Sequence, residues 1–236
     1  EFMDLCAVAE AASGRGVVQC VGVDQWGAVA AGAAQLLSTL CLSGPPALRP
    51  SIVPCIGFLL RRHPSLLQAP GAQGGGPYEV FQISLRGNGG DPSATRLHSA
   101  EALASLLRHY KMCAETSGAT GGASHVGSGY SEAAQRLAGL QPELLQILYA
   151  PGAQVVASHA LGVLHAMSEL GVLHPSTVLP SLMAASLAGD LALAGTTQRL
   201  ILRLVEGTPA LLARRLGAGI REAADLIDSR DVAVGQ

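Results

Sequence analysis

Aromatic and charged residues are scarce in this sequence. Among its 236 residues, aromatic side chains account for 3% and charged ones for 14%, whereas hydrophobic residues account for 49%. The core must therefore consist mainly of Ala, Leu, Val and Ile, which suits closely packed helices better than a β-sandwich or barrel. One stretch, YEVFQISL at residues 78–85, has some strand character, and we interpret it as a short helix. The sequence predicts an all-α fold.

Cysteine pairs and membrane-length apolar runs are also missing. The five cysteines are widely spaced and form no CxxC pair, which argues against a disulfide framework or a zinc cage. Buried free thiols in a reducing compartment fit this pattern better. The longest apolar run is interrupted by Gly, Gln, Ser and Pro before it reaches the length of a membrane span. We therefore expect neither a metal site nor a membrane partner.

Motifs for catalysis or cofactor binding are absent as well. The segment GAQGGGP, residues 71–77, lacks the Lys–Ser/Thr ending of a phosphate-binding loop, and GSGYS, residues 127–131, is not a nucleophile elbow. No HExxH motif occurs, and no carboxylate or cysteine completes a metal site with His98 and His109. Glu222 and Asp225 fit a solvated helix face better than an acid/base pair. We predict that the chain is not an enzyme and needs no cofactor.

Helical spacing of apolar residues is the strongest positive signal. One stripe is expected near the middle of the chain and four more follow toward its C-terminus, separated by short connections that imply antiparallel neighbours. The five stripes are Leu103, Leu106, Leu107 and Tyr110; Val156, Ala160, Val163, Leu164, Met167 and Leu170; Leu179, Leu182, Met183 and Leu187; Leu200, Ile201, Leu204 and Val205; and Leu212, Leu216, Ile220, Ala223 and Ile227.

Helix pairs that recur at about 40 residues predict a HEAT/armadillo-like solenoid of antiparallel helix pairs. We divide the chain into N-terminal helical repeats (1–115), a low-complexity flexible loop (116–131) and C-terminal HEAT-like repeats (132–236). We expect these parts to form one continuous solenoid, and the chain to be a fragment of a longer one.

Arginine supplies nearly all of the positive charge, since Lys111 is the only lysine, and the formal net charge is −2. This balance excludes an overall positive field that would attract nucleic acid, so any contact with nucleic acid would need a local patch of basic residues. Clustered arginines could meet phosphates or an acidic protein, and the alternative is a charged helix end or a solvated helix face. The candidates for binding DNA or a partner are Arg61, Arg62, Arg199, Arg203, Arg214, Arg215 and Arg221.

A tight corner lies in SELGVLHPSTVLPSLMAAS, residues 168–186. We predict that Gly171 closes one helix in the left-handed conformation and that Pro175 opens the next, where its missing N–H costs nothing. Pro180 falls about one turn later and should kink that helix. His174 is then expected to be structural, and the corner to be an architectural joint.

This corner is also where a family becomes recognisable. The segments LGVLHAMSELGVLHPSTVLPSLMAAS (161–186) and LILRLVEGTPALLARRLGAGIREAADLI (200–227) resemble the C-terminal HEAT region of the Nipped-B/NIPBL family of cohesin-loading factors, the adherins. A second block, IGFLLRRHPSLL (56–67), resembles the family's helix and HPSL corner, in the same order along the chain. The resemblance covers about residues 50–228.

The resemblance implies a non-catalytic scaffold in the nucleus that promotes cohesin loading onto chromatin and sister chromatid cohesion. Its implied partners are the cohesin kleisin and SMC subunits and DNA, with the loader's partner subunit bound by a region outside this chain. Two alternatives stay open. A helical-repeat adaptor in transport or a vesicle coat would fit the helix periodicity equally well. A small helical enzyme would need an acid/base pair, a nucleophile or a metal site, and the sequence displays no such set of residues.

Overall fold

The computed structural model describes residues 23–68, 75–87, 92–119, 125–150, 153–188, 191–206 and 209–234. Its regular elements within these ranges are all helical, which confirms the predicted all-α class, and residues 78–85 lie in a helix. The helices are α2 (Val23–Ser43), α3 (Arg49–Arg62), α4 (Pro77–Arg86), α5 (Pro92–Ala119), α6 (His125–Leu137), α7 (Gln141–Tyr149), α8 (Gln154–Glu169), α9 (Pro175–Ala188), α10 (Leu191–Val205) and α11 (Pro209–Val234), with the 3-10 turns η1 (Pro46–Leu48), η2 (Pro64–Leu67) and η3 (Ala138–Leu140).

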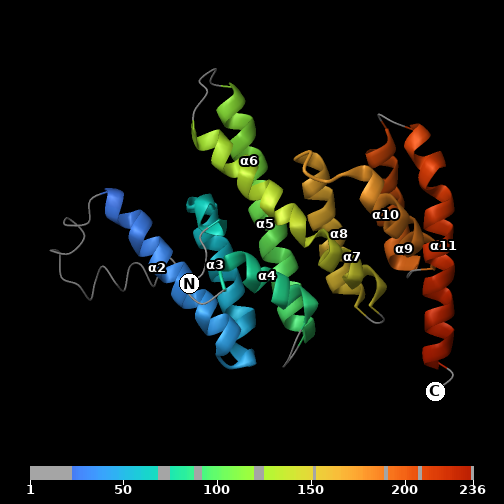
Figure 1. The fold of residues 1–236 in the computed structure, drawn as a ribbon, viewed down its shortest axis with the longest axis horizontal. Coiled ribbons are helices and arrows are strands. Elements are labelled where there is room, and N and C mark those ends of the chain that lie inside the picture. The colour runs from blue at the N-terminus through green and yellow to red at the C-terminus, as the bar shows by residue number, and fades with distance from the viewer. Residues whose placement is uncertain are drawn as a thin grey trace.

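The helices form two adjacent rows. In the first row α2, α4, α7, α9 and α11 contact one another in that order, and in the second row α3, α5, α8 and α10 do so. Each pair of consecutive helices bridges the rows, because α2 packs on α3, α4 on α5, α7 on α8 and α9 on α10. Figure 1 shows the helices following one another along the longest axis of the molecule, from α2 at one end to α11 at the other. α6 packs against α5 and η2.

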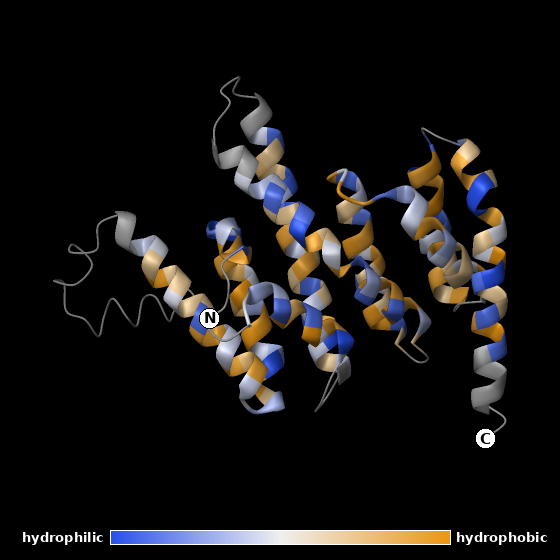
Figure 2. Ribbon diagram, viewed as in Figure 1, coloured by the Kyte–Doolittle hydropathy of each residue, from blue (hydrophilic) through white to orange (hydrophobic). Residues whose placement is uncertain are grey.

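The core between the rows is aliphatic, as the composition predicts. The stripes predicted for α5, α8 and α10 are buried, except that Leu170 is half-buried. Figure 2 shows apolar and polar residues alternating along these helices, as amphipathic packing requires. A polar contact closes one helix end in this core: the buried Tyr110 hydroxyl donates to the Leu60 carbonyl at 3.0 Å. That carbonyl lies in the last turn of α3, and residue 64 is a proline without an N–H to offer it.

The corner between α8 and α9 has the predicted form. Gly171 has a φ of 69°, and its N–H donates to the Ser168 carbonyl at 3.0 Å. The N–H of Val172 donates to the Met167 carbonyl at 3.1 Å, which completes a Schellman motif. Pro175 begins α9.

The other two residues of this corner are also in place. The His174 carbonyl accepts from the N–H and hydroxyl of Thr177 at the start of α9. Nδ1 of His174 lies 2.6 Å from the Ser176 hydroxyl, and a structural role for this side chain stays a prediction. Pro180 lies inside α9, and the kink expected there stays a prediction.

The apolar stripe predicted for α11 is wrong in detail. Leu216, Ile220 and Ile227 are about half exposed, whereas Gly219 and Ala223 are buried. The reason is close helix packing: a Cβ added to Gly219 would lie 2.8 Å from the Met183 Cβ of α9. Small residues let α11 approach α9, and the larger apolar residues are displaced to its sides. Leu187 of α9, also predicted in a stripe, is 62% exposed.

The flexible loop predicted at residues 116–131 is shorter than its composition suggests. Residues 116–119 belong to the end of α5, and residues 125–131 belong to α6, while residues 120–124 lie outside the described ranges. Tertiary packing overrides the low helix propensity of glycine here. The Tyr130 ring of α6 contacts the Tyr110 ring at a centroid distance of 5.3 Å, and Ala133 and Ala134 are buried.

α2 contains a segment, Trp26–Ser43, that is long and apolar enough to cross a membrane by length and composition alone. Its buried residues fall on one side at helical spacing: Ala30, Ala34, Ser38 and Cys41. This side packs against α3 and α4. Trp26, Val29 and Leu36 remain exposed.

Candidate functional site

Three helices of the second row meet at Glu169, near the end of α8. Lys111 of α5 places its Nζ 3.2 Å from Glu169 Oε2, and Arg203 of α10 places its Nη1 3.0 Å from Glu169 Oε1. The same Arg203 nitrogen lies 2.5 Å from Nε2 of His165, one turn earlier on α8. Glu169 therefore links α5, α8 and α10 through two cations.

The chemistry of Arg203 also fixes the state of its neighbours. A guanidinium can only donate, so Arg203 is the donor in this contact, and Nδ1 of His165 lies 3.9 Å from Glu169 Oε2. Desolvation raises the pKa of Glu169, but the hydrogen bond from Lys111, the charges of His165 and Lys111, and the hydrogen bond from Arg203 together outweigh it, so the net pKa lies below the ordinary 4.5. Glu169 is thus a carboxylate that holds Arg203 in place at neutral pH.

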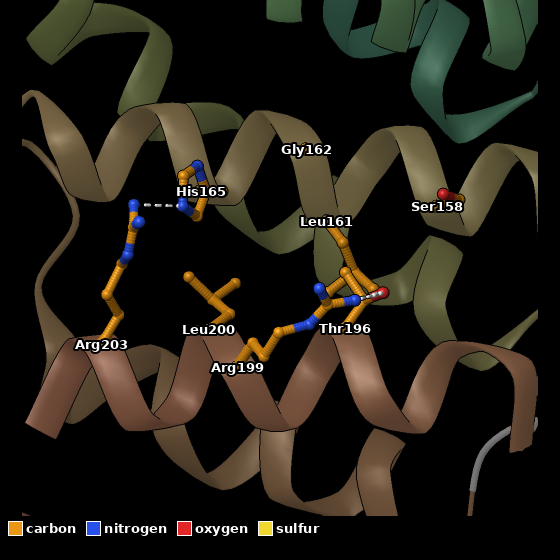
Figure 3. Close-up of a pocket in the computed structure, with 8 residues that line it drawn as sticks. All are labelled: Ser158, Leu161, Gly162, His165, Thr196, Arg199, Leu200 and Arg203. Atoms are coloured by element: carbon orange, nitrogen blue, oxygen red, sulfur yellow. Dashed lines mark hydrogen bonds between the residues drawn. The ribbon is translucent and has the colours of Figure 1, made fainter.

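A cleft of about 340 Å³ lies beside this junction, between α8 and α10. Figure 3 shows Arg199 and Arg203 rising from α10 on either side of Leu200, with His165 and Leu161 facing them from α8. Leu161 and Leu200 are almost fully buried and form an apolar floor. The residues that line the cleft are Ser158, Leu161, Gly162, His165, Thr196, Arg199, Leu200 and Arg203.

The cleft carries positive charge and hydroxyl groups without a carboxylate among its lining residues. Arg199 donates from Nε to the Gly195 carbonyl at 3.2 Å, and its Nη2 lies 3.4 Å from Thr196 Oγ1. Arg199 meets no carboxylate in the described part of the chain. In Figure 3 its guanidinium lies toward Leu161 and Thr196, at the opposite end of the cleft from Arg203.

Gly162 lines this cleft. It is exposed in the middle of α8, where glycine costs about 1 kcal/mol relative to alanine. Close packing does not require it, because a Cβ added there would meet nothing within 4 Å. The missing side chain leaves space over the floor formed by Leu161 and Leu200.

A second, smaller cavity of about 190 Å³ lies between α3 and α5 of the same row. Arg61 lines it and hydrogen-bonds to the Ser105 hydroxyl, and Glu101 lines the same cavity. Glu101 also lies 3.3 Å from His98 Nδ1 and 3.6 Å from His159 Nε2, which joins α5 to α8. Because a carboxylate is part of its wall, this cavity is less suited to an anion than the cleft between α8 and α10.

The predicted arginines lie on three separate helices. Arg61 and Arg62 are in the last turn of α3, Arg199 and Arg203 line the cleft, and three others are exposed on α11: Arg214, Arg215 and Arg221. Those on α11 form no ion pair with the residues that the structure describes. Of the predicted arginines, only Arg199 and Arg203 therefore lie together at one cleft.

The groups that could do covalent or metal chemistry are dispersed. No three His, Cys, Asp or Glu side chains gather at a metal-binding distance among the described residues, and Cys41, Cys55 and Cys113 are free thiols. Burial raises the pKa values of Cys41 and Tyr110, which disfavours the thiolate and the phenolate. What the second row displays is a set of hydrogen-bond donors rather than a nucleophile with a base.

Sequence reasoning missed three residues of this surface: Gly162, His165 and Glu169. Two signals could have indicated them. His165 and Glu169 are four residues apart on one helix, so they share a face with each other. Gly162 interrupts an apolar helix without ending it, which indicates a packing or functional reason for the glycine.

Comparison with known proteins gives no family model that matches this chain and no match among curated proteins.

Proposed function

We propose that this chain is a non-catalytic helical-repeat scaffold of a cohesin loader, which binds cohesin and DNA in the nucleus. The observation that carries the proposal is the pairing of the helices. Each hairpin contributes one helix to each row, and equivalent helices of successive hairpins contact one another. This is the arrangement expected of a HEAT/armadillo-like solenoid, in which each repeat contacts only its neighbours and long surfaces remain free for partners.

The corner between α8 and α9 supports the cohesin-loader assignment. The sequence Gly–apolar–apolar–His–Pro is the motif on which the resemblance to the Nipped-B/NIPBL family rests. Its glycine and proline have a physical role, since Gly171 closes α8 in a Schellman motif and Pro175 begins α9. The motif thus belongs to the corner between α8 and α9, and a related scaffold would need the same residues there.

The proposed partners follow from the resemblance to the cohesin-loading factors. The kleisin and SMC subunits of cohesin are the proposed protein partners, and the exposed arginines of α11 are the proposed contacts to DNA phosphates. Arginine binds phosphate with bidentate hydrogen bonds, and each phosphate contact makes binding sensitive to salt.

A reconstitution tests this function. The full chain is immobilised and incubated separately with purified cohesin SMC and kleisin subunits, with purified coat and transport components, and with labelled duplex DNA at several salt concentrations. The proposal expects retention of cohesin subunits and salt-sensitive DNA binding that weakens in the Arg214→Glu/Arg215→Glu variant. Arg108→Glu, an exposed change on α5, is the matched control. Retention of coat or transport components without cohesin would instead favour the adaptor.

A further inference from the structure

The cleft between α8 and α10 has free donors at both ends. Arg203 uses Nη1 for its contacts with Glu169 and His165, so its Nε and Nη2 groups have no hydrogen-bond partner among the described residues. At the other end, Arg199 bonds only to groups of its own helix in the described part of the chain. Ser158 and Thr196 add hydroxyl groups to the wall. These donors match an anion with planar, bidentate acceptor oxygens.

The donors are also held in position before any ligand arrives. Glu169 and His165 fix Arg203, and Glu169 is in turn held by Lys111 of α5. Preorganised side chains lose less conformational freedom on binding, which increases affinity. The apolar floor and the gap at Gly162 provide room for the methylene groups that precede a side-chain carboxylate.

The size and charge of the surroundings favour a protein side chain over nucleic acid. A space of about 340 Å³ admits a few side chains, whereas a duplex needs a longer basic track. Along the same row the carboxylates of Glu101 and Glu169 lie close to the surface and would repel a continuous line of phosphates. The chain also has a net charge of −2. An isolated acidic side chain can meet Arg199, at the end of the cleft away from Arg203 and Glu169, without approaching these carboxylates as a polyanion would.

We propose that the cleft between α8 and α10 binds an acidic side chain, Asp or Glu, from an extended segment of a partner protein. Arg199 binds its carboxylate at one end of the cleft, with Arg203 at the other end, and the gap left by Gly162 gives room for its methylene groups. This inference rests on the proposed scaffold function, because it takes the ligand to be a protein, and it specifies which surface of the second row that protein contacts.

The test is fluorescence anisotropy of the full chain with a short labelled peptide that carries one glutamate among serine and glycine residues. The matched peptide has glutamine in place of the glutamate. The site requires that the glutamate peptide binds saturably and that the glutamine peptide binds at least about tenfold more weakly, as expected for loss of a charge-assisted hydrogen bond. Arg199→Gln should weaken binding of the glutamate peptide by a similar factor, and Arg215→Gln on α11 should leave it unchanged.

The glycine offers a test of the cleft itself. Gly162→Leu fills the space and should abolish peptide binding, whereas Gly162→Ala adds one methyl group and should retain it. We expect both Gly162 variants to keep α8 helical, which circular dichroism checks. If Gly162→Leu does not fold, Arg199→Gln, a surface substitution, tests the site instead. Unchanged binding in Gly162→Leu or in Arg199→Gln would overturn the proposal, as would a wild-type chain that binds duplex DNA but not the glutamate peptide.

The failures of the two proposals remain distinguishable. If the peptide binds through Arg199 and Gly162 but purified cohesin is not retained, the acidic-segment site stands and the cohesin-loader function falls. If cohesin is retained equally by wild type and Gly162→Leu, and the peptide does not bind, the function stands and this site falls.

Discussion

The joint between α4 and α7 predicts an asymmetry between the two partners of one ion pair. Arg86 of α4 donates from Nη2 and Nε to Glu143 Oε1 of α7, at 2.8 and 3.2 Å, and Gln82 donates to the same oxygen at 2.9 Å. The Glu143 side chain is only 5% exposed, whereas that of Arg86 is 50% exposed. Each substitution therefore leaves a different partner behind: a buried carboxylate in one case and a half-exposed guanidinium in the other.

The magnitudes follow from these exposures. Arg86→Met leaves a buried carboxylate with Gln82 as its remaining partner, and should lower the free energy of unfolding by about 3 kcal/mol. Glu143→Gln keeps an acceptor for Gln82 and lets Arg86 turn to water, so its cost should be about 1 kcal/mol. The double variant Arg86→Met/Glu143→Leu removes both charges, and should lie within about 1 kcal/mol of wild type.

Urea unfolding followed by circular dichroism measures the free energy of unfolding of all three variants. For a chain of this size, each kcal/mol corresponds to a shift of about 2–4 °C in Tm. Equal losses in the two single variants, or a larger loss in Glu143→Gln, would refute the reasoning that burial of Glu143 determines the cost.

Four further substitutions have expected outcomes. Gly162→Ala should raise the free energy of unfolding by about 1 kcal/mol, whereas Gly219→Ala should lower it by about 1–2 kcal/mol because the added Cβ meets Met183. The urea midpoints of the two variants measure this difference, and a gain in stability in both would contradict the close packing of α11 on α9. Tyr110→Phe should cost about 1–2 kcal/mol, since the Leu60 carbonyl loses its partner, and Tyr130→Phe is the control; equal stability of both variants would show that the contact is not needed. The pKa of Glu169 is lowered on folding, so its ion pairs stabilise the protein fully above the ordinary value of 4.5, and this contribution is lost as the pH falls through the folded pKa. Glu169→Gln should therefore be less stable than wild type at neutral pH and lose less stability on acidification, whereas parallel pH profiles would exclude this linkage.

The sequence predicted the parts of the fold that depend on local rules. Gly171 and Pro175 could be assigned to a helix end and a helix start because each residue has one dominant backbone preference. The buried stripes of α5, α8 and α10 were predictable because each helix lies between neighbours and its apolar residues repeat at helical spacing.

Contacts between distant segments could not be predicted in this way. Nothing local shows that Gly219 will approach Met183, so the stripe of α11 was assigned to its larger residues. Residues 125–131 were also misjudged for lack of a distant contact: their glycine content predicted a loop, whereas packing of Tyr130 on Tyr110 favours the helix that they form. In the candidate site the arginines of α10 could be found from their spacing. Their counterparts on α8, and the cleft itself, depend on how two helices pack.

Cohesin binding and an acidic-segment site on the second row of helices are the two proposals, and one partner tests both. The most direct measurement is a titration of purified kleisin subunit into the full chain, comparing wild type, Gly162→Ala and Gly162→Leu. We expect saturable binding by wild type and Gly162→Ala, and binding about tenfold weaker or lost in Gly162→Leu. Absence of saturable kleisin binding by wild type, at low salt and with the chain folded, would contradict this expectation.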